Sequence, residues 1–214
     1  MLTGPQYIPD TVHQALILCH GWGSNGDDLF SLWPYLKHAL PNTAFFCPNA
    51  PIDLGYGYAW FNLNSIEVPT DYSAVKKLNE AAMASLPALD TYINNIKTQF
   101  SLDNHQLILG GFSQGGLMAL FSGLKNSVKG IIAMSSVPLV AQQDMHAVPV
   151  LLTHGRDDTV VPLAGLELTQ SELQKIGCIP TVFISPHMGH SIDDLCIEQI
   201  NDFLKKLSPC HKRS

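Results

Sequence analysis

The sequence has few charged residues, no long apolar run and no excess of positive charge. Only 14% of its 214 residues are Asp, Glu, Lys or Arg, whereas a typical globular chain has about 25%. The 12 Lys and Arg side chains are outnumbered by 18 Asp and Glu, so the net charge of −6 argues against a protein that neutralises many phosphates. With 46% apolar residues, the chain is also too hydrophobic to be disordered. Nucleic acids and anionic membranes are therefore not expected as partners.

The sequence also lacks the features of a membrane-spanning or secreted chain. A membrane span needs roughly 20 consecutive apolar residues, whereas the apolar runs here are short, as in Ala15–Cys19. The first basic residue is Lys37, so no basic region precedes an apolar stretch as it does in a secretory signal. The five cysteines are odd in number and include no CxxC pair, which favours reduced thiols over disulfides or a zinc site. We therefore expect a cytoplasmic protein with no integral membrane association.

Short apolar runs alternate with helical patterns along the whole chain. No repeat or linker divides it, so we expect a single domain over residues 1–214, with a solvated tail from about residue 208. Runs that are short and apolar on both faces suit strands of a parallel sheet covered by helices. The alternation predicts a doubly wound α/β sheet. The predicted strands are Ala15–Cys19, Thr43–Cys47, Gln106–Leu109, Val128–Met134, Val148–Thr153 and Thr181–Ile184.

Prolines and capping residues indicate where the helices begin. Pro87 is expected to break or start the helix whose apolar pattern runs on to Phe100. Pro162 is placed like the first-turn proline of a later helix. Ser191, with Asp194 three residues further on, predicts a capping box for the last helix.

One serine lies where such a sheet places its chemistry. Ligands of doubly wound sheets bind at the carboxyl ends of the strands, and Ser113 follows a predicted strand and opens a predicted helix in the segment GGFSQGG. This context is that of a nucleophile elbow, in which glycines two residues before and after the serine avoid a clash. The alternative is a helix-entry turn that Ser113 merely caps. We take Ser113 as the candidate nucleophile.

An activated serine needs a base, and the base needs an acid that orients it. Position along the predicted sheet leaves His187 and His190, in SPHMGHS, as the candidate bases after Ser113. We favour His190 because it directly precedes the last helix, and we expect His187 at the rim of the site. The segment HGRDDTVVP supplies an acid at a strand end, but spacing alone does not decide between Asp157 and Asp158.

A serine hydrolase also needs two donors for the oxyanion. The expected donors are the backbone N–H of Gln114, which follows the nucleophile, and that of Trp22, in the loop after an early strand. His20 in that loop is expected to make structural hydrogen bonds rather than to act as a base. No metal is expected, because His187 and His190 lie on a glycine-containing loop with no third ligand. No cofactor is expected either.

Several segments together resemble a known family. LCHGWGSNGDD, AWFN, LGGFSQGG, HGRDDTVVP and MGHS occur here in the order seen in the phospholipase/carboxylesterase family, which includes acyl-protein thioesterases. The resemblance implies a compact α/β-hydrolase fold with little or no cap domain. It implies that Ser113 is the nucleophile and His190 the base, and its HGxxDxxVP pattern puts the acid on Asp158. Trp22 and Gln114 match the family's oxyanion donors.

The resemblance further implies a serine hydrolase that cleaves carboxylic esters or thioesters through an acyl-enzyme. Its substrates would be small esters, lysophospholipids or acylated proteins. The alternatives are a non-catalytic acyl-binding protein on the same fold and a peptidase. Asn62 stands where the family often has Asp, close to the expected acyl site. The sequence leaves the oligomeric state open, a homodimer included. The side chains expected to wall the acyl site, with ordinary core as the alternative, are Trp60, Phe61, Leu63 and Ile66.

Overall fold

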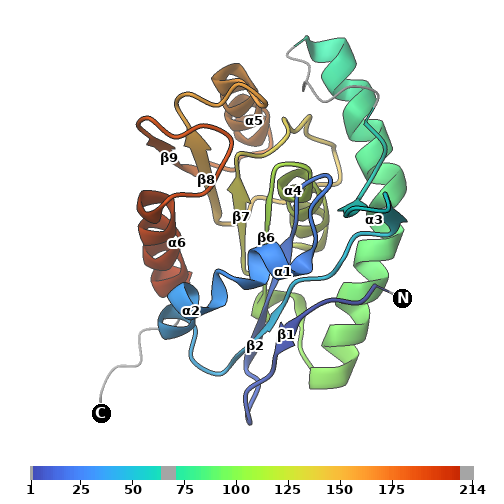
Figure 1. The fold of residues 1–214 in the computed structure, drawn as a ribbon, viewed down its shortest axis with the longest axis vertical. Coiled ribbons are helices and arrows are strands. Elements are labelled where there is room, and N and C mark those ends of the chain that lie inside the picture. Colours follow the sequence, from blue (N-terminus) through green and yellow to red (C-terminus); the bar gives the residue numbers. More distant parts are fainter. Residues whose placement is uncertain (1, 64–70, 208–214) are drawn as a thin grey trace.

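A twisted sheet with helices on both faces forms the centre of the molecule (Figure 1). The computed structural model describes residues 2–63 and 71–207. Within them the sheet has the strand order β1-β3-β2-β6-β7-β8-β9, parallel throughout except for β1, which pairs antiparallel with β3. The strands are β1 Gln6–Tyr7, β2 Gln14–Cys19, β3 Thr43–Phe46, β6 Leu107–Phe112, β7 Gly130–Met134, β8 Val150–Gly155 and β9 Thr181–Ser185.

The doubly wound α/β architecture predicted from the strand–helix alternation is confirmed. All six predicted strands are present, as β2, β3, β6, β7, β8 and β9. The largest difference is at β6, which runs on to Phe112 instead of ending at Leu109. Gly110 and Gly111 continue the ladder of this strand with β2 and β7, and a side chain on either would collide with its neighbours.

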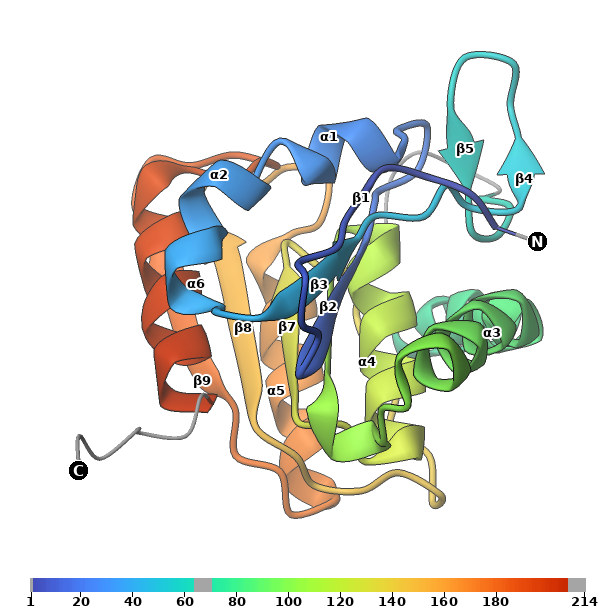
Figure 2. The same cartoon turned by 90° about the horizontal axis from the view of Figure 1, so that it is seen from below.

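Helices of different lengths cover the two faces of the sheet. The helices are α1 Gly26–Phe30, α2 Trp33–Leu36, α3 Tyr72–Phe100, α4 Gln114–Asn126, α5 Leu163–Lys175 and α6 Asp194–Leu207, with 3-10 turns at Lys37–Ala39 and Asn104–Gln106. Side chains of α3, α4 and α5 share one buried core, and side chains of α1, α2 and α6 share the other. Figure 2 shows these two groups of helices on either side of the strands.

Strand β2 shows why both faces need cover. Its alternate residues Ala15 and Ile17 point into the core on the α3 side, whereas Leu16 and Leu18 point into the core on the α1 side. All six residues of this strand are buried. A strand that is apolar on both faces is stable only between two helical layers, which also explains the low content of charged residues.

Two predicted helix starts are wrong. Pro87 lies inside α3, which begins at Tyr72 with the Asp71 side chain accepting a hydrogen bond from Ala74 N. Pro87 lies on the exposed side of the helix. The last helix is capped by Asp193, whose side chain accepts from Cys196 N, and not by the predicted box on Ser191.

The insertions around this sheet are small in the described part of the chain. A two-stranded hairpin, β4 Ile52–Asp53 and β5 Tyr58–Ala59, lies beside the sheet (Figure 2). Ile66 and the predicted tail from about residue 208 lie outside the described residues. Across residues 2–63 and 71–207, none of the helices combines the length and apolar character that a bilayer crossing requires.

Candidate active site

Ser113 sits in a strained turn between β6 and α4. Its backbone has φ +53° and ψ −115°, a region that non-glycine residues rarely adopt. The turn is held by a hydrogen bond from Ser113 N to Met134 O of 2.9 Å. A Cβ on Gly111 would lie 2.3 Å from the backbone of Gly115, and a Cβ on Gly115 would lie 2.0 Å from Cys19 O. The two flanking glycines are therefore required by close backbone packing, and the serine projects from the end of the strand.

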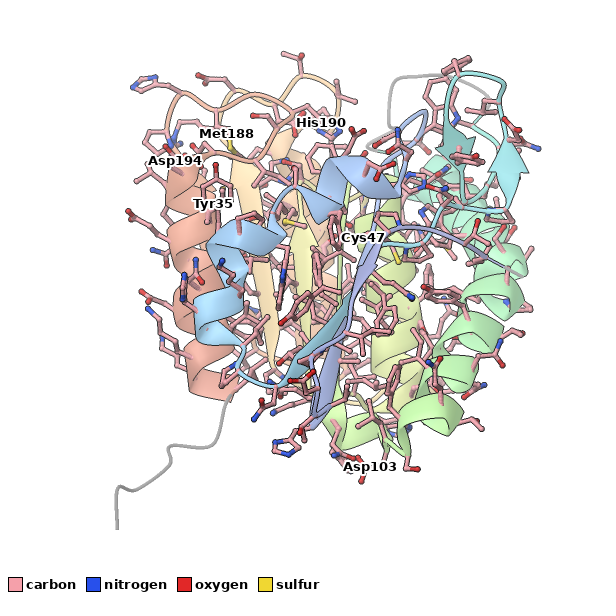
Figure 3. All side chains as sticks on the ribbon, turned by 60° about the horizontal axis from the view of Figure 1, so that its bottom comes forward. Tyr35, Cys47, Asp103, Met188, His190 and Asp194 are labelled. Atoms are coloured by element: carbon pink, nitrogen blue, oxygen red, sulfur yellow. The ribbon has the colours of Figure 1, made fainter. Side chains whose placement is uncertain are left out.

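His190 and Asp158 form a hydrogen-bonded pair at the same end of the sheet. His190 Nδ1 lies 2.8 Å from Asp158 Oδ2. Since a carboxylate accepts, Nδ1 carries the proton and Nε2 is left as the basic nitrogen. Figure 3 shows His190 at the end of the strands close to α1, opposite the end where Asp103 lies. The carboxyl ends of β8 and β9 thus bring together two residues that are 32 apart in sequence.

The environment of Asp158 keeps it ionised. Burial acts to raise its pKa, but hydrogen bonds from His190 and from the backbone N–H of Val161 outweigh it and leave the pKa below its ordinary value. Val160 N and Val161 N donate to Asp158 Oδ1 at 3.0 and 2.9 Å. Its neighbour Asp157 is exposed and lies 3.9 Å from the ring of His187, which is 93% exposed. The structure therefore brings Asp158, and not Asp157, to His190.

Ser113 and His190 open into one cavity of about 550 Å³. Trp22, Gln114 and Leu63 also line it, so the two expected oxyanion donors belong to residues at its wall. The full set of described lining residues is Gly21, Trp22, Ser24, Asp28, Leu29, Ser31, Leu32, Leu63, Phe112, Ser113, Gln114, Val137, Val160, His190, Ser191 and Ile192.

Trp60 and Phe61 lie in the core and are not among the residues that line the cavity. The Gln114 side chain holds this segment in place. Its Oε1 accepts from Trp60 N at 2.8 Å, and its Nε2 donates to Phe61 O at 2.7 Å. Trp60 and Phe61 are therefore not at the cavity surface where the acyl wall was expected, because the Gln114 side chain holds their backbone in the interior. Of the expected wall, Leu63 reaches the cavity.

The loop that carries Trp22 is fixed by buried hydrogen bonds. His20 Nε2 accepts from Ala50 N at 3.0 Å, so its Nδ1 carries the proton and donates to Gly21 O at 2.7 Å. Burial lowers the pKa of His20 and keeps it neutral. Gly23 has φ +75°, and its N–H donates to Tyr58 O in the hairpin. The structure thus gives His20 a structural role in holding the loop.

His154 is a further neighbour of the site, near the carboxyl end of β8. Its Nε2 lies 2.8 Å from Val161 O and 3.5 Å from Asp158 Oδ2. Burial lowers the pKa of His154, although the Val161 carbonyl and the Asp158 carboxylate act the other way. The imidazole is therefore neutral and supports the turn that donates to Asp158. Its spacing of four residues from an acid at a strand end is the signal that could have found it.

A strained serine after a central strand and a hydrogen-bonded histidine–aspartate pair, both at one cavity on a parallel sheet, are the features of an α/β-hydrolase of the serine type. The family described as Phospholipase/Carboxylesterase matches residues 8–208. The chain belongs to this family, and the resemblance noted from the sequence motifs is confirmed. It is accordingly an enzyme, a serine hydrolase of carboxylic esters.

Individual relatives agree with this assignment. The chain is 28% identical to acyl-protein thioesterase 1 of Emericella nidulans, over 91% of this chain and 90% of that one. It is 26% identical to acyl-protein thioesterase 1 homolog 2 of Dictyostelium discoideum, over 92% and 91%. The crystal structure of esterase PE8 is 33% identical and superposes with a TM-score of 0.87 over 97% of this chain and 99% of that one. The Bacillus cereus carboxylesterase shares the fold at 18% identity, with a TM-score of 0.80 over 97% and 95%.

Proposed function

We propose that the protein hydrolyses carboxylic esters or thioesters through an acyl-enzyme on Ser113. The observation that carries the proposal is the opening of the strained serine and the His190–Asp158 pair into one cavity. Substrates of the carboxylesterase, acyl-protein thioesterase and lysophospholipase types all contain the acyl group that this site would accept. The names of the relatives support the first two of these types.

The proposed reaction has two halves. Ser113 Oγ attacks the acyl carbon and gives its proton to His190 Nε2, while the oxyanion accepts hydrogen bonds from the N–H groups of Trp22 and Gln114. The bond to the leaving oxygen or sulfur then breaks, and His190 gives it that proton. Water attacks the acyl-enzyme with His190 again as base, which releases the carboxylic acid and restores Ser113. Asp158 holds the imidazole in the tautomer that this cycle needs.

Two further parts of the proposal concern the residues that contact the acyl chain and the cellular compartment of the protein. Leu63 is proposed to contact the acyl chain, with Trp60 and Phe61 supporting that wall from behind. A reducing, cytoplasmic setting is supported by the free and buried state of the four cysteines in the described residues, Cys19, Cys47, Cys178 and Cys196.

A series of nitrophenyl esters from acetate to laurate tests the proposed function. The wild-type protein is expected to hydrolyse them, and Ser113→Ala is expected to lower kcat by several orders of magnitude, as in other triads. The chain length that is turned over fastest would report how far the acyl side of the cavity extends. A folded wild-type sample that hydrolyses none of the esters and does not react with a fluorophosphonate would show that the proposal is wrong.

A further inference from the structure

The cavity in front of Ser113 has two sides that come from opposite faces of the sheet. The aliphatic side is formed by residues that pack in the core of the α3, α4 and α5 face: Leu63, Val137 and Val160. The α1 side includes apolar residues that pack in the core of the α1, α2 and α6 face: Leu29, Leu32, Phe112 and Ile192. A substrate bound at Ser113 therefore meets two different surfaces.

His190 belongs to the α1 side. Its ring packs on Phe112 with 4.7 Å between ring centroids, and Ile192 follows two residues later on the same side. Because the histidine of a serine hydrolase gives its proton to the leaving group, the alcohol or thiol must depart next to His190. The acyl chain is then left with the aliphatic side.

The α1 side carries a row of polar side chains as well. Ser24, Asp28 and Ser31 all line the cavity, Asp28 from α1 itself and the two serines from the segments that flank this short helix. The Ser24 hydroxyl donates to Asp28 Oδ2 and so orients the carboxylate. Among the described lining residues, Asp28 is the one acidic side chain. We call Ser24, Asp28 and Ser31 the α1 polar row.

We propose that the α1 polar row is a subsite for the leaving group and that it selects alcohols or thiols that carry a positive charge. The inference rests on the proposed function and specifies its substrate class. A carboxylate beside the departing group attracts a cation and repels an anion, and its effect is modest because Asp28 is exposed to solvent. The bond that breaks and the proton that His190 supplies are those of the proposed reaction.

Three butyrate esters with matched leaving groups test this selection. Choline and 3,3-dimethylbutanol have the same shape and differ by one positive charge, and glycolate carries a negative charge. At low salt, the wild-type kcat/KM for the choline ester is expected to exceed that for the dimethylbutyl ester by about three- to tenfold, with the glycolate ester slowest. At about 1 M salt the preference is expected to shrink, because exposed charges are screened over about 3 Å.

Variants of neighbouring acidic residues provide the matched control. Asp28→Asn is expected to bring the ratio of kcat/KM for the choline ester to that for the dimethylbutyl ester close to one. Asp27→Asn makes the same change of charge one residue away, on an exposed side chain that does not line the cavity, and is expected to keep the preference. Ser31→Asp adds a second carboxylate to the row and is expected to strengthen the preference, which gives a test independent of how Asp28→Asn folds.

Two results would overturn the inference. One is equal turnover of the choline and dimethylbutyl esters by the wild-type protein. The other is an equal loss of preference in Asp27→Asn and Asp28→Asn, since the net charge of the molecule would then account for it. Failure of the proposed function looks different, because the neutral dimethylbutyl ester would then not be hydrolysed either.

Discussion

At the scale of single residues, Asp158 is a buried negative charge that four nitrogen atoms surround. His190 Nδ1, Val160 N and Val161 N lie within 3.0 Å of its oxygens, and His154 Nε2 lies at 3.5 Å. These groups offset the cost of removing a carboxylate from water. The same contacts fix the direction in which Asp158 faces His190. The two adjacent acids therefore differ in their surroundings, since Asp157 has none of these contacts.

Replacement of Asp157 and of Asp158 by asparagine, one at a time, tests which of the two acids is needed for catalysis. Asp158→Asn is expected to lower kcat for nitrophenyl butyrate by about 10⁴-fold, because the amide favours the wrong imidazole tautomer. Asp157→Asn, on an exposed side chain, is expected to stay within about twofold of the wild type. Steady-state kinetics on both variants at pH 8 measures the difference. A harmless Asp158→Asn with an inactive Asp157→Asn would reverse the assignment.

The residues of the candidate site differ in how well the sequence predicts them. Ser113 and His190 can be predicted because each follows a short apolar strand, and parallel strands bring their carboxyl ends to one edge. The choice of Asp158 over Asp157 required a family pattern, because the turn that buries one of two adjacent carboxylates leaves no mark in the spacing. The side-chain role of Gln114 could not be predicted either, since its partners on Trp60 and Phe61 lie more than 50 residues away.

At the scale of the elements, strands were easier to predict than helix ends. The core strands are recognisable because burial on both faces makes each a continuous apolar run. Helix starts depend on one or two side-chain hydrogen bonds, such as that from Cys196 N to Asp193, which several nearby residues could equally have made. Helix α3 shows a further reason, because burial of Val75, Ala82 and Leu89 on both sides of Pro87 keeps the helix continuous.

The proline inside α3 should therefore cost stability. Pro87→Ala is expected to raise the free energy of unfolding by about 1–3 kcal/mol, because it restores a backbone donor and removes a ring clash. The gain falls short of the full penalty, since alanine also gives the unfolded chain more freedom. Chemical denaturation measures it, with Ala84→Ser on the same exposed side as a control for a helix-surface change. A destabilised Pro87→Ala would mean that the packing of α3 depends on the local distortion.

At the scale of the whole molecule, the net charge is −6, and two neutral histidines are buried in the interior. His20 and His154 are 0% and 1% exposed, and burial lowers the pKa of both. Each holds a part of the site, the Trp22 loop in one case and the turn at Asp158 in the other. Protonation of either ring would place a positive charge in the interior. In His20 it would also break the hydrogen bond that Nε2 accepts from Ala50 N. In His154 it would disturb the turn beside Asp158.

Stability should consequently fall in mild acid. A histidine whose pKa is lower in the folded state favours folding fully above its unfolded value of about 6.5, and this contribution is lost as the pH falls below that value. Below that pH, each of the two rings lowers the free energy of unfolding by up to about 1.4 kcal/mol per pH unit. Asp158 has the depressed pKa of a carboxylate, so its own contribution is lost only below about pH 4.

Unfolding curves between pH 8 and pH 5 test this expectation. The wild-type free energy of unfolding is expected to decline below about pH 6.5, and His154→Gln is expected to reduce the slope by up to about 1.4 kcal/mol per pH unit, because glutamine can donate to Val161 O but does not titrate. His38→Gln, on an exposed side chain, is expected to leave the slope unchanged. If His154→Gln and His38→Gln both gave the wild-type slope, His154 would not be the group whose protonation destabilises the fold, and the acid sensitivity would have to come from His20 or from the surface charge.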